Sequence, residues 1–106
     1  MLKALTLTAF LLVAASPAIA AVDRDTAVKT LASLFNSTDV CQLSISRDKV
    51  NAYRADNTPA GDTAFNIDVF RATDDLYRQQ KTWTKDQTDA YCKTAAGTAK
   101  TLGMLL

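Results

Sequence analysis

The chain has 106 residues, of which 48% are apolar and 22% charged, with a formal net charge of +1 and no histidine. This length allows one domain at most, and the near-neutral charge argues against a nucleic-acid-binding protein, which needs a basic surplus to displace phosphate counterions. The missing imidazole excludes Ser-His-Asp and Cys-His catalytic sites and the commonest side-chain ligand of metals.

The N-terminal segment has the features of a secretory signal peptide. Lys3 supplies a positive charge, residues 5–15 form an apolar run, and residues 16–20 end in the small-x-small pattern that signal peptidase recognises. The apolar run is too short for a bilayer span, which needs about 20 apolar residues. We therefore expect cleavage of residues 1–20, one domain over residues 21–106, and a periplasmic or secreted protein without stable membrane insertion.

The first helix is predicted from about Thr26 to Asn36, because apolar side chains recur there at helical spacing. The stripe consists of Val28, Leu31, Leu34 and Phe35. Asp25 is a suitable N-cap, and the polar run Asn36-Ser37-Thr38 is expected to end the helix.

The next segment, residues 40–55, fits two interpretations. Asp39 and Gln42 have the spacing of a capping box, and the absence of glycine and proline favours a helix. Residues 41–46, however, alternate apolar and polar side chains as a half-buried strand does. We favour the helix.

A turn-forming cluster at residues 56–62 divides the domain into two halves, and a third helix is predicted over residues 63–80. Apolar residues alternate over 64–70, but the helical stripe continues too far for a typical strand. We place Phe35, Phe65 and Phe70 in the core.

The last helix has the clearest start. Thr84 as N-cap with Gln87 three residues later forms a capping box. Small residues then form a ridge that lets another helix approach closely: Cys92, Ala95, Ala96, Ala99 and Gly103. The chain ends on the apolar residues 104–106, which must be packed against the domain or offered to a partner.

The two cysteines, Cys41 and Cys92, are expected to form one structural disulfide in an oxidising compartment. Their spacing is not that of a C-x-x-C redox or metal site. The predicted fold is therefore an all-α, four-helix bundle in which the disulfide joins the start of the second helix to the middle of the fourth. The alternative is an α+β fold with short strands near residues 41–46 and 64–70.

Few residues carry recognisable chemistry, and the sequence indicates no catalytic residue, metal site or cofactor. The adjacent pair Asp74-Asp75 cannot converge on one substrate from a helix, because neighbouring side chains diverge by about 100°. The spacing of these acids to Arg71 and Arg78 indicates surface ion pairs, with an anion site at the two arginines as the alternative.

Trp83 precedes the last helix and can cover the bundle or anchor a partner. The tyrosines Tyr53, Tyr77 and Tyr91 are expected at the boundary between core and solvent.

These observations favour a non-enzymatic binding or interaction protein, either of inhibitor or immunity type or associated with the envelope. Its partner would be another periplasmic or secreted protein. A periplasmic acid-stress chaperone is the alternative, because protonating eleven aspartates would give the domain a large positive charge. A small enzyme using aspartate or lysine chemistry is a further alternative, and a pocket with a desolvated Asp or Lys would be its signature.

Overall fold

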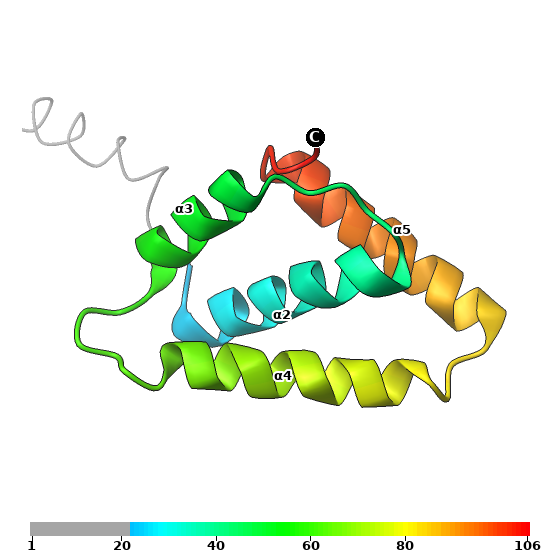
Figure 1. Ribbon diagram of the computed structural model, residues 1–106, viewed down its shortest axis with the longest axis horizontal. Coiled ribbons are helices and arrows are strands. Elements are labelled where there is room, and N and C mark those ends of the chain that lie inside the picture. The colour runs from blue at the N-terminus through cyan, green and yellow to red at the C-terminus, as the bar shows by residue number, and fades with distance from the viewer. Residues whose placement is uncertain (1–21) are drawn as a thin grey trace, which may run out of the picture.

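The computed structural model describes residues 22–106, so the predicted signal peptide lies outside the described residues. Within this range the chain forms four helices: α2 (Arg24–Val40), α3 (Arg47–Asn57), α4 (Phe65–Gln80) and α5 (Lys85–Thr101) (Figure 1). The predicted all-α fold is confirmed, and the α+β alternative is wrong, since these residues form only one isolated β-bridge. None of the four helices is long and apolar enough to cross a membrane.

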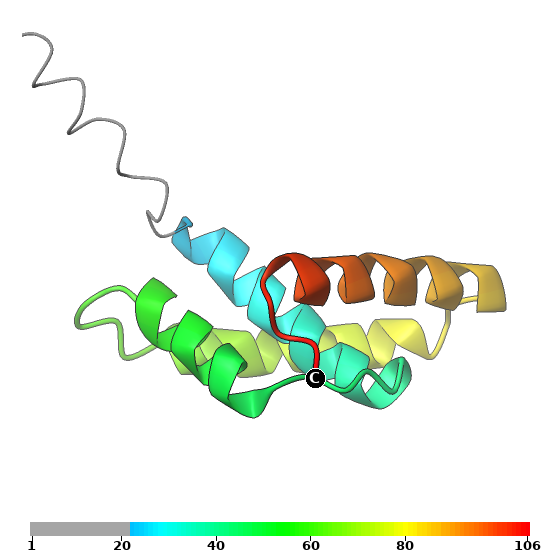
Figure 2. The same cartoon turned by 90° about the horizontal axis from the view of Figure 1, so that it is seen from above.

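Helix α2 occupies the centre of the structure, and each of the other three helices packs against it. Figures 1 and 2 show α4 running beside α2 in the same direction, while α3 and α5 lie across its other side. The peripheral helices make only minor contacts with one another. The fold is therefore arranged around a single central helix.

The core follows from this arrangement, because α2 contributes more buried side chains than any other helix. The buried cluster consists of Ala27, Val28, Leu31 and Leu34 of α2, Val50 of α3, Phe65 and Val69 of α4, Ala99 of α5, and Met104. Burying a Leu or Phe side chain fully stabilises a fold by about 1.5–3 kcal/mol, so a few such residues account for much of the stability.

Helix α2 is longer at both ends than the sequence predicts. Its N-cap is Asp23 and not Asp25, because the Asp23 side chain accepts a hydrogen bond from the Thr26 amide at 2.7 Å. The helix also continues through Asn36, Ser37 and Thr38. These side chains can remain in a helix because each finds a partner: the Ser37 and Thr38 hydroxyls donate to carbonyls one turn back, and Asn36 donates to Tyr91.

The segment after α2 is not helical, so the prediction of a helix starting at residue 40 and capped by Asp39 is wrong. Asp39 lies within α2, and Gln42 has a positive φ of 57°, which ends the helical path. Helix α3 starts only at Arg47, where the Ser46 side chain caps it by accepting from the Lys49 amide.

The C-terminal tail packs against this non-helical segment. Ile45 and Leu105 form the isolated antiparallel bridge, the Ser46 amide donates to the Met104 carbonyl at 2.7 Å, and Leu106 donates to Ser44. Met104 is buried in the core, whereas Leu106 is 85% exposed. The alternation of residues 41–46 thus corresponds to one short extended contact.

Helix α4 confirms the helical interpretation of residues 65–80 and corrects one core residue. Phe65 is fully buried and Phe35 half-buried, as expected, but Phe70 is 72% exposed. Phe70 lies five residues after Phe65, and five residues rotate the helix by about 140° away from the core-facing side. Phe70 therefore lies outside the arc of α4 that faces the core, although the apolar pattern of the sequence had placed it there.

Helix α5 begins as predicted, with the reciprocal Thr84–Gln87 capping box present. Ala95 and Ala99 are buried, so part of the predicted small-residue ridge faces the core. Gly103 lies beyond the helix, in a left-handed turn with φ of 70° that redirects the chain into the tail.

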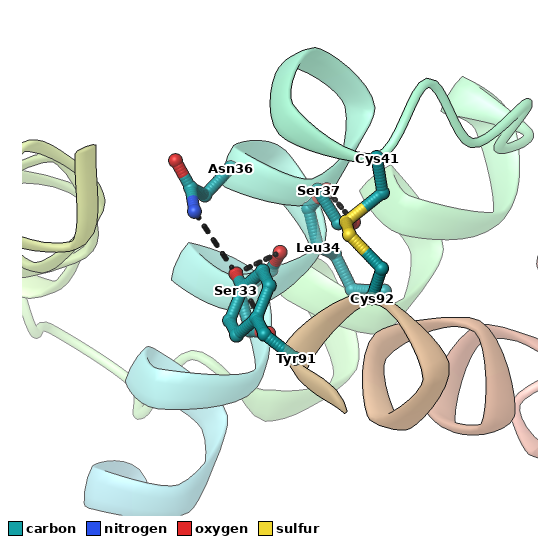
Figure 3. Close-up of a disulfide and its surroundings, with 7 residues drawn as sticks. All are labelled: Ser33, Leu34, Asn36, Ser37, Cys41, Tyr91 and Cys92. Atoms are coloured by element: carbon teal, nitrogen blue, oxygen red, sulfur yellow. Dashed lines mark hydrogen bonds between the residues drawn. A yellow bond between two sulfur atoms is a disulfide. The ribbon is translucent and has the colours of Figure 1, made fainter. Parts of the chain in front are cut away.

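The Cys41–Cys92 disulfide is present, with the two α-carbons 5.5 Å apart. Because Cys41 is the C-cap of α2, the disulfide joins the end of α2 to the middle of α5, and the predicted link to the start of the second helix is wrong. Figure 3 shows it beside the contacts of Tyr91 with α2. Both sets of contacts hold α5 against the C-terminal half of α2.

Replacing both cysteines with serine (Cys41→Ser, Cys92→Ser) should lower the free energy of unfolding by about 4 kcal/mol. The reason is that the disulfide closes a long loop and thereby reduces the conformational entropy of the unfolded chain. The two residues are 51 positions apart. Urea denaturation of the oxidised protein and the double variant, followed by circular dichroism, measures the difference. Equal stabilities would contradict a structural role for the disulfide.

Candidate functional site

A surface depression lies where α3 and α4 flank α2, and we call it the α3–α4 groove. It consists of two adjoining hollows of about 320 and 400 Å³ that share Phe35 and Arg54. The α4 side is lined by Asn66, Val69, Phe70 and Thr73. The α3 side is lined by Ile45, Arg47, Val50 and Asn51, with Leu34 and Thr38 of α2 beneath.

Arg54 occupies the centre of this groove and is held on two sides. Its guanidinium carbon lies 5.9 Å from the centre of the Phe35 ring, and Nη2 donates to the Asn51 side chain at 2.6 Å. Nε of Arg54 is buried and has no hydrogen-bond partner among the described residues. The groove therefore contains a cation whose position is fixed by contacts on two sides.

Exposed apolar side chains lie along α4 beside the groove. Phe70 is 72% exposed, Ile67 52% and Tyr77 46%, and Lys81 lies over the Tyr77 ring at 4.8 Å. Phe70 is itself part of the groove lining, so an exposed aromatic ring borders the cation-containing depression.

Two further hollows lie between the other pairs of peripheral helices. The one between α3 and α5, about 480 Å³, is lined mainly by threonines with Tyr53 and Leu102. The one between α4 and α5, about 310 Å³, is bordered by Leu76 and Tyr91. Neither contains an arginine.

Trp83 lies in the connection between α4 and α5 and is half-buried, with its ring centre 4.9 Å from that of Tyr91. The Tyr91 hydroxyl donates to the Ser33 carbonyl and accepts from Asn36, as Figure 3 shows. Trp83 therefore lies against Tyr91, the residue through which α5 contacts α2, and its half-buried ring leaves both sequence interpretations open. Tyr53 and Tyr91 are half-buried, and Tyr77 is 46% exposed.

The two arginines singled out from the sequence, Arg71 and Arg78, are both exposed on α4. Arg78 forms the predicted ion pair with Asp74 at 2.7 Å. Asp68 pairs with Arg24 of α2 at 2.6 Å, although its spacing had indicated Arg71. Neither Arg71 nor Arg78 lines one of the hollows described above.

Arg24 joins the starts of α2 and α4 by contacting both Asp62 and Asp68, and it also lies over the Phe65 ring at 5.7 Å. The hydrogen bond from Arg24 has the largest effect on the pKa of Asp62 and lowers it. Burial opposes this shift, and the charge of Arg24 and the backbone amides of Ala64 and Phe65 lower the pKa further. In turn, both carboxylates raise the pKa of Arg24.

The residues that line the four hollows include no aspartate and one lysine, Lys29. Asp25 raises the pKa of Lys29, which is the opposite of what a lysine base requires. Within residues 22–106, no group of three or more metal-ligating side chains comes together.

Sequence reasoning missed the groove and Arg54. The only available signal was the pair Asn51 and Arg54, three residues apart and thus adjacent on one helix face. Nothing in the sequence indicates that Phe35 of α2 lies under this arginine, because that contact depends on how α3 crosses α2.

Comparison with protein-family models, curated proteins and solved structures found no match to this chain.

The Arg24 contacts predict an acid-sensitive contribution to stability. Because the pKa of Asp62 is lower in the folded chain than in the unfolded chain, where it is about 3.9, its contribution is complete above that value and is lost as the pH falls through the folded pKa. Asp62→Asn should therefore melt at a lower temperature than the original protein at pH 7, and the two melting temperatures should converge as the pH falls through the lowered pKa of the folded Asp62.

Thermal melts between pH 2 and pH 7 measure this convergence. Asp25→Asn serves as a control, because Asp25 pairs only with the exposed Lys29 on its own helix. A difference between Asp62→Asn and the original protein that stays constant down to pH 2 would contradict the assignment.

Proposed function

We propose that this protein is a non-enzymatic binding protein of the periplasm or another secreted location, which acts by docking on another protein of that compartment. The observation that carries the proposal is the exposure of Phe70 at the edge of the α3–α4 groove. An inhibitor or immunity protein of a secreted enzyme is the type that best combines this surface with a small, disulfide-linked scaffold.

The argument from Phe70 is energetic. A phenylalanine on the surface contributes little to folding, and a cluster of exposed apolar side chains carries a risk of aggregation. Ile67 and Tyr77 add to the same helix surface. Aromatic and arginine side chains that become buried on association supply a large share of the binding energy at protein interfaces. The α3–α4 groove has both residue types, with Phe70 on α4 and two arginines, Arg47 and Arg54, on α3.

The proposed location rests on two features. The Cys41–Cys92 disulfide is of the kind that persists in oxidising compartments outside the cytoplasm. Residues 1–20 have the composition of a secretory signal peptide.

Affinity capture from a periplasmic extract tests the proposal, with the oxidised protein and two variants as bait. Phe70→Ser should lose the captured partner by about tenfold or more while melting at nearly the same temperature, because the side chain is already exposed. Leu106→Ser removes an apolar side chain that is 85% exposed at the C-terminus, and it should capture the partner as well as the original protein does.

Equal capture by the original protein and by Phe70→Ser would contradict the proposal. A partner lost in Leu106→Ser and retained in Phe70→Ser would also contradict it, because it would place the contact on the C-terminal tail.

A further inference from the structure

We infer that the α3–α4 groove binds an acidic segment of the partner, whose carboxylates pair with Arg54 and Arg47 while an adjacent large apolar side chain packs against Phe35 and Phe70. This inference rests on the proposed function and specifies the chemistry of the partner.

The charges of the groove are the first argument. Within the described part of the chain, seven cationic side chains form no ion pair with a carboxylate, and Arg47 and Arg54 are the two of them that line one of the four hollows. No aspartate lines either half of the groove. Two unpaired cations beside apolar walls attract an anionic ligand more strongly than fully solvated cations do.

The position of Arg54 is the second argument. The Phe35 ring and the Asn51 side chain already hold its guanidinium, so binding orders this group less than it would order a free surface arginine. A carboxylate is the acceptor whose planar geometry fits a guanidinium best, because it can form two parallel hydrogen bonds.

The spacing of the arginines favours a segment and not a single small anion. Arg47 and Arg54 both line the groove and are two turns apart on α3, about 10 Å along the axis. An extended segment with acidic residues at alternate positions presents its carboxylates on one face and its intervening side chains on the other. Carboxylates can then meet α3 while the apolar side chains meet Val69 and Phe70 of α4.

The test uses the acetylated and amidated peptide Glu-Phe-Glu-Leu-Glu, titrated into the oxidised, isotope-labelled protein and followed by NMR. The peptide should shift the resonances of Asn51, Arg54 and Phe70. A matched peptide with glutamine at each glutamate position should bind about tenfold more weakly or less, and binding of the acidic peptide should weaken as salt is added.

Variants separate the charge of Arg54 from its packing. Arg54→Met keeps an unbranched apolar stem over Phe35 and should weaken peptide binding by about tenfold, whereas Arg54→Lys keeps the charge and should lose less. Lys100→Met removes one exposed charge on α5 and should bind like the original protein. Melting temperatures confirm that each variant is folded.

Peptide shifts confined to other helices, equal binding of the glutamine peptide, or unchanged binding by Arg54→Met would overturn the inference. A partner whose capture needs Phe70 but survives Arg54→Met would overturn the groove inference and leave the proposed function standing. Capture that does not depend on Phe70 would instead contradict the proposed function.

Discussion

The structure depends on the burial of one helix, α2, against three others. Because α3, α4 and α5 all use α2 as their main contact, its apolar residues Ala27, Val28, Leu31 and Leu34 supply nearly half of the buried cluster. The remaining contacts fix particular places along α2. At the N-terminus of α2, Arg24 holds the start of α4. Near the C-terminus of α2, the Cys41–Cys92 disulfide and the Tyr91 hydroxyl hold α5.

An arrangement around one helix also explains where the surface depressions lie. Peripheral helices that pack on α2 but only slightly on one another leave a hollow between each pair. Among these hollows, the α3–α4 groove alone contains arginines and an exposed phenylalanine. The proposed binding function thus uses a depression that the fold itself creates, modified by the residues that α3 and α4 present to it.

Local patterns predicted much of this fold but not the groove. The Thr84–Gln87 capping box and the helical spacing over residues 65–80 depend on near neighbours, so they can be read from the sequence. The end of α2 was misplaced because polar Asn36 and Ser37 look like helix breakers until Tyr91 and the Leu34 carbonyl supply their partners. The solvent exposure of Phe70 and the contact of Arg54 with Phe35 depend on how helices cross, which no local pattern encodes.

Native-state hydrogen exchange tests the central role of α2 most directly. The account predicts that amides of residues 31–34 exchange only through global unfolding. Amides of α3, which has Val50 as its one buried residue, should exchange through an opening of lower free energy. Exchange of α3 amides as slow as that of α2 would contradict the account, because it would show that α3 is held by more than its contact with the central helix.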